Sequence, residues 1–158
     1  MAAVRYLAKE ERNTMDTILN ILHVATAVFI IGPMAILPMT ALRTIRTGAA
    51  SQVTTLAKST ALFTYLSLAV AFFGFGVLGM ADPQYDLSVT TPWVMASLIL
   101  YVIAFALNLI LVVPGLRKAA HTMSVNGGRG ATYPAVAAGS GTVALLLLAT
   151  VVLMVWKP

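Results

Sequence analysis

Few side chains in this sequence are of a type that could do chemistry within a long apolar stretch. Asn20 and His23 are three residues apart, so on a helix they share one face. A polar pair in such surroundings is a candidate haem ligand, quinone hydrogen-bond donor or part of a proton path. The structural alternative, which we favour for His23 and equally for Asn108, is a hydrogen bond to a neighbouring helix or to a partner subunit.

A metal or cofactor site needs more ligands than the sequence supplies. A bis-histidine haem requires a second histidine at a similar depth, and the other histidine, His121, follows Arg117 and Lys118 in a loop expected on the opposite side. The chain contains no cysteine, which excludes thiolate metal sites, disulfides and thiol oxidant chemistry. Five methionines are dispersed among the apolar stretches instead of clustered at ligand spacing, namely Met34, Met39, Met80, Met95 and Met154. We therefore predict no catalytic residue, no metal site and no cofactor of the chain's own.

Glycines gather in two of the apolar stretches. Gly74, Gly76 and Gly79 match the dinucleotide-binding pattern G-x-G-x-x-G, but that pattern binds phosphate only between a strand and a helix in water. Here it lies near the end of an apolar stretch, where small residues let helices approach closely. Gly139 and Gly141 each follow an alanine by four residues, which is the small-x-x-x-small spacing of close helix pairs. We predict that these five glycines are helix-packing positions.

All charged residues lie outside four long uncharged stretches. These stretches cover residues 17–42, 59–81, 87–116 and 130–156. Each exceeds the roughly 20 apolar residues that a helix needs to cross hydrocarbon. With 59% hydrophobic and 9% charged residues, the composition also differs strongly from that of a soluble domain. The sequence therefore predicts an all-α, polytopic membrane protein.

Residues 17–158 are expected to form one transmembrane domain, and residues 1–16 a polar N-terminal tail. The four spans are placed at about 17–42, 59–81, 91–116 and 133–156. The first span should kink or end early near Gly32 and Pro33, because proline lacks a backbone N–H and clashes with the preceding helical turn.

Loop charge predicts the orientation of the spans. Basic residues dominate the connection between the first two spans and that between the last two, whereas the middle connection carries Asp82 and Asp86 without Lys or Arg. The positive-inside rule then places the two basic connections in the cytoplasm and both termini outside. The N-terminus conflicts with this rule, because Arg5, Lys9 and Arg12 lie there beside acidic residues.

The basic residues also indicate what the chain contacts. Its net charge of +5 is explained by loop charge that faces anionic lipid, for which cardiolipin is one candidate, and not by a nucleic-acid interface. The expected lipid contacts are Arg43, Arg46, Arg117 and Lys118.

The opening of the first span carries a family resemblance. Residues 19–33 read LNILHVATAVFIIGP, and a basic loop and three further spans follow. This arrangement resembles small bacterial integral membrane proteins of unknown function. More narrowly, it is similar to the four-helix accessory subunit of the actinobacterial respiratory supercomplex, in which a cytochrome bcc menaquinol oxidase is joined to a haem-copper terminal oxidase.

The resemblance implies a non-catalytic, stabilising subunit of the bacterial plasma membrane, with partners that carry haem and copper while it carries no cofactor. It assigns no catalytic residue. Two other functions stay open: a haem- or quinone-binding membrane anchor that uses His23, and a small transporter component. The transporter is disfavoured because no span contains an acidic or basic residue to carry a coupling charge.

Overall fold

The computed structural model describes the backbone of residues 2–81, 87–126 and 133–157 and, within them, most side chains from residue 10 onward. Within these ranges the regular structure is entirely helical. The described residues include four helices that are long and apolar enough to cross a membrane, Glu10–Thr47, Ala50–Met80, Pro92–Val125 and Pro134–Trp156. The predicted all-α, four-span class is therefore confirmed.

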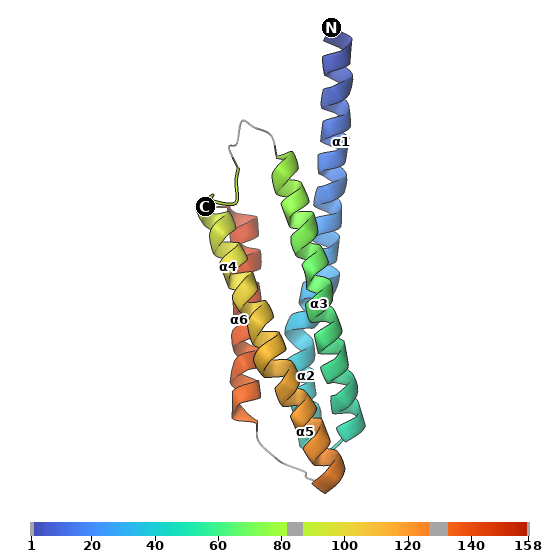
Figure 1. Ribbon diagram of the computed structural model, residues 1–158, viewed down its shortest axis with the longest axis vertical. Helices are drawn as coiled ribbons and strands as arrows, with labels where there is room; N and C mark the ends of the chain where they lie inside the picture. The colour runs from blue at the N-terminus through green and yellow to red at the C-terminus, as the bar shows by residue number, and fades with distance from the viewer. Residues whose placement is uncertain (1, 82–86, 127–132, 158) are drawn as a thin grey trace.

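The four spans form two hairpins that pack side by side (Figure 1). In the first hairpin, α1 (Ala2–Thr26), the π-helical turn η1 (Ala27–Ile31) and α2 (Gly32–Thr47) make one long arm, and α3 (Ala50–Met80) returns beside it. In the second hairpin, α4 (Pro92–Leu107), the π-helical turn η3 (Asn108–Val112) and α5 (Val113–Asn126) make the long arm, and α6 (Pro134–Trp156) returns. The start of α1 and the end of α6 lie toward the same end of the bundle, which we call the terminal end.

The opposite end, which we call the basic end, holds the turn of the first hairpin and the exposed Arg43, Arg46, Lys58, Arg117 and Lys118. The turn depends on Gly48, whose φ of 82° lies in the left-handed region that glycine adopts without steric cost. The Gly48 N–H donates to the Ile45 carbonyl at 3.2 Å and so caps α2, and α3 begins at Ala50.

Two prolines explain the two π-helical turns. Pro33 lies two residues after the end of η1, and Pro114 lies two residues after the end of η3. A helical proline cannot donate a hydrogen bond to the carbonyl four residues earlier, and its ring clashes with that carbonyl. Those carbonyls belong to Phe29 and Ile110, which lie inside η1 and η3, and a wider turn relieves the clash. The first span does not end near Gly32 and Pro33, as one of the two expectations had it: a π-helical turn precedes Gly32, and the helix continues to Thr47.

Several helices extend beyond the spans that the sequence predicted. The backbone of residues 2–16, expected as a tail, is helical and continuous with α1. At the basic end, α3 begins at Ala50 instead of near residue 59, and α5 continues past Leu116 to Asn126. His121, which we expected in a loop, is therefore an exposed residue of a helix.

The best-packed part of the bundle lies toward the basic end. Met34 and Ile45 of α2, Val53 of α3 and Leu116 of α5 are among the largest fully buried side chains. Ten further members of the same core are Ala41, Ala57, Ala104, Val112, Ala119, Ala120, Met123, Val136, Val143 and Leu147. Close packing of α2, α3, α5 and α6 at this end fixes the register in which the polar side chains described below meet.

Candidate functional site

His23 ties α1 to α3. Its Nδ1 atom lies 2.9 Å from the backbone oxygen of Val70, and the ring is partly buried. Because a carbonyl oxygen only accepts hydrogen bonds, Nδ1 must carry the proton, which leaves Nε2 of the neutral ring as an acceptor. The favoured interpretation of His23, an interhelical hydrogen bond, agrees with this geometry. Asn20 is exposed, so the predicted polar pair does not act as one site.

Gly74 makes the space that His23 occupies. A Cβ atom built on Gly74 would lie 2.9 Å from Cε1 and 3.3 Å from Nδ1 of His23. Gly74 lies one helical turn beyond Val70 on α3, so a side chain there would cover the carbonyl that His23 reaches. A Cβ on Gly76 would lie 3.3 Å from Cδ2 of Leu19, so the contact between α1 and α3 continues toward the terminal end.

Asn108 ties η3 to α3 in the buried interior. Its Nδ2 donates to Thr64 Oγ1 at 3.1 Å, and Thr64 Oγ1 donates in turn to the Thr60 carbonyl at 2.7 Å. All three residues are completely buried. Asn108 Oδ1 is buried and has no hydrogen-bond partner among the described residues. In an apolar interior an unsatisfied amide oxygen costs free energy. Packing around Asn108 and the hydrogen bond from its Nδ2 atom must offset that cost.

A second polar bridge joins α3 to α4. Ser67 Oγ donates to the Thr64 carbonyl at 2.6 Å and lies 2.8 Å from the hydroxyl of Tyr101. Since the Ser67 proton is used on the carbonyl, the Tyr101 hydroxyl is the donor of the second bond. Sequence reasoning missed Thr60, Thr64, Ser67 and Tyr101. The available signal was the spacing of the three hydroxyl residues, which recur every three or four positions on one face of α3.

The remaining predicted packing glycines divide into two groups. A Cβ on Gly139 of α6 would lie 2.8 Å from Cδ2 of Leu111, so this glycine packs against η3. Among the residues that the structure describes, a Cβ on Gly79 or Gly141 would have no neighbour within 4 Å, so neither glycine makes a close contact with another described helix. The physical reason is their direction: Gly141 is two residues from Gly139 and faces about 200° away from it on the helix.

Gly115 is a packing glycine that the sequence analysis did not identify. A Cβ built there would collide with Cγ2 of the buried Val136. The backbone of α5 therefore packs directly against a side chain of α6 at this point. Gly115 and Ala119 have the small-x-x-x-small spacing, so the pattern that indicated Gly139 and Gly141 would also have indicated Gly115.

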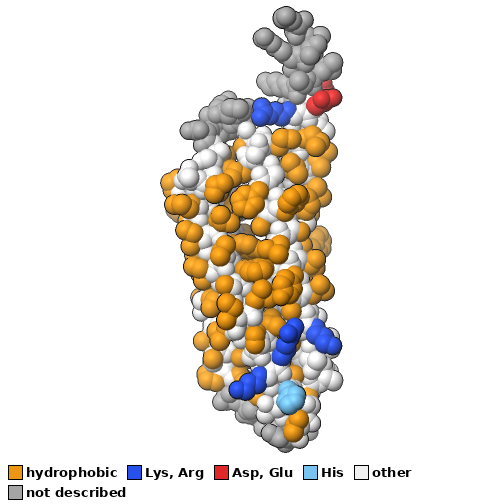
Figure 2. Space-filling model, viewed as in Figure 1, with side chains coloured by type: hydrophobic (Ala, Val, Ile, Leu, Met, Phe, Trp, Pro, Cys, Tyr) orange, Lys and Arg blue, Asp and Glu red, His pale blue; other side chains and the backbone are white. Residues whose placement is uncertain are grey.

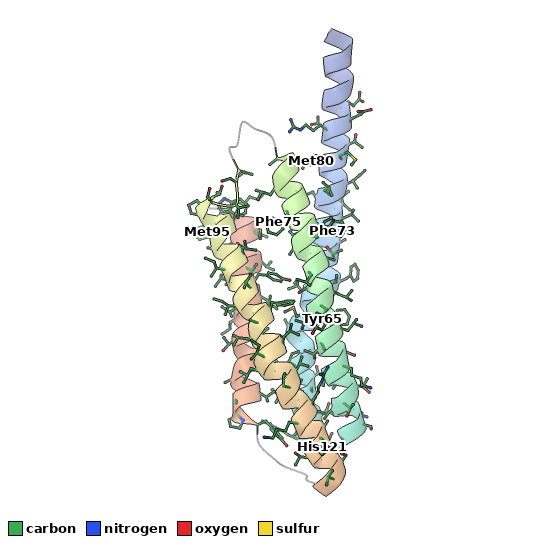
Figure 3. All side chains as sticks on the ribbon, viewed as in Figure 1. Tyr65, Phe73, Phe75, Met80, Met95 and His121 are labelled. Carbon is green, nitrogen blue, oxygen red and sulfur yellow. The ribbon has the colours of Figure 1, made fainter. Side chains whose placement is uncertain are left out.

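The two histidines lie in different halves of the bundle. His23 bonds the backbone of Val70, toward the terminal end, whereas His121 is exposed on α5 at the basic end (Figure 3). The two rings cannot act as paired ligands. Among the described residues, no group of three or more His, Cys, Asp or Glu side chains could hold a metal ion.

The basic end presents a surface of one charge sign. The predicted lipid contacts Arg43, Arg46, Arg117 and Lys118 are all exposed there, and basic side chains gather below an apolar belt (Figure 2). The sequence contains no acidic residue in either 17–81 or 87–158, so no nearby carboxylate of this chain neutralises them. Such a surface attracts anionic headgroups.

The Asn108–Thr64 bond gives a measurable coupling between η3 and α3. Interhelical hydrogen bonds in membranes average about 0.6 kcal/mol, with a maximum near 1.7 kcal/mol. We expect a double-mutant cycle of Asn108→Ala and Thr64→Ala to return a coupling of that size in detergent unfolding followed by circular dichroism. Strictly additive effects would show that the two side chains do not interact.

Comparison with known proteins agrees with this architecture. A family model described as "Predicted integral membrane protein (DUF2269)" matches residues 17–158, from the start of the first uncharged stretch to the end of the chain. No curated protein and no solved structure matches the chain. With four membrane-length helices among the described residues, of which the first begins shortly before the matched region, the chain is a multi-pass membrane protein and belongs to the DUF2269 family of predicted integral membrane proteins.

Proposed function

We propose that this protein is a non-catalytic, stabilising subunit of a respiratory electron-transport supercomplex in the bacterial plasma membrane. The observation that carries the proposal is the use of the polar side chains within the spans. His23, Asn108 and Tyr101 each bond another helix of the same chain, at Val70, Thr64 and Ser67. Interhelical hydrogen bonds of this kind hold a helix bundle together, which favours a scaffolding role over a substrate site.

The choice of a respiratory assembly rests on the resemblance of residues 19–33 and of the four-span arrangement to an accessory subunit of the cytochrome bcc and terminal oxidase supercomplex. In this proposal the partner subunits carry haem and copper, and the chain transfers no electrons. The apolar belt between its two ends would lie against lipid and partner helices (Figure 2).

The basic end supports a second part of the proposal, which is contact with anionic lipid. Arg43 and Arg46 end the first long arm, and Arg117 and Lys118 lie on α5 at the same end. Each basic residue near an anionic membrane surface contributes about 1 kcal/mol of attraction. Lipid of this kind, for example cardiolipin, would bridge the subunit to its neighbours on the cytoplasmic side.

A haem- or quinone-binding anchor is the second candidate, and one observation favours it. The Nδ1–H of His23 is fixed on a backbone carbonyl, which is the arrangement that orients many metal-binding histidines through Nε2. A Soret band in the purified protein that disappears in His23→Ala would establish this alternative. Under the main proposal the purified chain has no such band.

The proposed orientation places both termini outside the cell and the basic end in the cytoplasm. Because the chain lacks cysteine, single cysteines at Ser88 and Ser124 report accessibility without background labelling. We expect Ser88→Cys to react with an impermeant maleimide in intact cells and Ser124→Cys to react only after lysis. The reverse pattern would contradict the orientation.

Deletion of the gene tests the stabilising role. We expect the respiratory assembly to separate into smaller species on native gels, while quinol-to-oxygen turnover persists at a substantial fraction of normal. Reintroduction of the gene should restore the large species. An isolated oxidase that loses all turnover in the deletion strain would show that the subunit takes part in catalysis.

A further inference from the structure

The two hairpins carry the same interruption at the same depth. Each long arm contains one π-helical turn that ends two residues before a proline, and the returning arms α3 and α6 contain none. His23 lies level with Val70, and η1 begins one helical turn nearer the basic end, beside the middle of α3. Asn108, the first residue of η3, lies level with Thr64 on the same part of α3.

Packing differs on the two sides of this level. Toward the basic end, α2, α3, α5 and α6 share the core, which Ala104 and Leu147 extend between α4 and α6 on the terminal side of η3. Toward the terminal end, no residue of α3 beyond Val70 is buried, and no described side chain of α1 or η1 is buried. In this half the close helix pairs are α1 with α3 and α4 with α6, each within one hairpin. The backbones of α3 and α4 lie apart, and the long Tyr101 side chain reaches from one helix to the other (Figure 1).

The bridge between the hairpins at the edge of the loosely packed half is the Tyr101–Ser67 hydrogen bond. This bond lies near the π-helical turns. It therefore joins the two hairpins at the boundary between the closely packed basic end and the loosely packed terminal half. In water, separating two apolar helix pairs would expose apolar surface at a large cost. In a bilayer it exchanges helix contacts for contacts with equally apolar lipid chains, so the cost is limited to lost packing and this bond.

We propose that the terminal halves of the two hairpins open and close relative to each other, with Tyr101–Ser67 as the latch of the closed state. In this motion the uninterrupted α3 and α6 bend as continuous helices, and the long arms follow them by flexing at η1 and η3. The packed core at the basic end is the fixed base of this motion. π-Helical turns are suited to the role because the α-helical ladder is already interrupted there. The inference is independent of the respiratory function proposed above.

Spin-label distances in lipid vesicles test the proposal, and the cysteine-free sequence makes labelling specific. The pair Gly79→Cys and Val155→Cys spans the hairpins at the terminal end, where both positions are exposed. The pair Ser51→Cys and Ser124→Cys spans them at the basic end, also at exposed positions. We expect a broad or two-component distance distribution for the terminal pair and a narrow one for the basic pair.

Removal of the latch should shift the equilibrium. Tyr101→Phe, and independently Ser67→Ala, should move the terminal-pair distribution several ångströms toward longer distances and leave the basic pair unchanged. Tyr65→Phe is the matched control, because Tyr65 is 58% exposed on the same helix as Ser67. Equal, narrow distributions at both ends, or a terminal pair that neither latch variant changes, would overturn the proposal.

Discussion

Gly115→Ala is expected to destabilise the protein by about 1–3 kcal/mol, the usual cost of overpacking a filled interior. The added methyl group would collide with Cγ2 of Val136, a buried, β-branched side chain that has little freedom to turn away. The helices α5 and α6 would have to move apart close to η3. The midpoint of thermal unfolding in mild detergent, followed by circular dichroism, measures the effect.

The collision has a specific remedy. Val136→Ala removes the colliding methyl groups, so the double variant Gly115→Ala with Val136→Ala should be more stable than the sum of the two single changes predicts. Gly141→Ala is the matched control, because a Cβ there has no neighbour within 4 Å in the described part of the chain. If Gly115→Ala is as harmless as Gly141→Ala, then α5 and α6 do not pack as described.

Gly74→Leu is expected to separate α1 from α3 and to expel the His23 ring from its hydrogen bond. Even a single Cβ would lie 2.9 Å from Cε1 of His23, and the rest of a leucine side chain would fill the path to the Val70 carbonyl. We expect a loss of roughly 1–3 kcal/mol, from overpacking together with one interhelical hydrogen bond. Detergent unfolding detects the change, with the equally sized Gly79→Leu at an open position as control.

The milder Gly74→Ala tests the partnership between Gly74 and His23. In the native chain it should weaken the His23 bond, whereas in a His23→Ala background it should be nearly neutral, since no ring remains to be displaced. His23→Ala alone should cost on the order of 0.5–2 kcal/mol and leave the visible spectrum of the purified protein unchanged. Equal effects of Gly74→Ala in both backgrounds would show that the glycine has another role.

The sequence was sufficient to predict the four spans, because charged residues are excluded from the hydrocarbon however the helices pack against one another. The interruption after Thr26 was also predictable, since a proline acts on the carbonyl four residues earlier whatever its tertiary surroundings. The same rule applied to Pro114 would have predicted η3, which we did not anticipate. The extension of α3 and α5 past the span ends could not be predicted from charge, because basic residues mark where hydrocarbon ends and not where a helix ends.

The partners of individual side chains were harder to predict, because they depend on which helix faces meet. Gly141 and Gly115 both have small-x-x-x-small spacing, yet among the described residues only Gly115 is placed against a side chain of another helix, that of Val136. Hydroxyl residues gave little signal, because Thr60 and Thr64 bond the carbonyls of their own helix. Only the fold shows that the Thr64 hydroxyl also accepts a hydrogen bond from Asn108.

Gentle co-purification tests the central claim most directly. A tagged copy of the chain, extracted from its native membrane in a mild detergent, should bring down b- and c-type haems together with terminal oxidase activity. A copy carrying Gly115→Ala, which weakens the fold, should recover less of both. Recovery of the native tagged protein free of any haem protein would contradict the proposal that it is a subunit of a respiratory assembly.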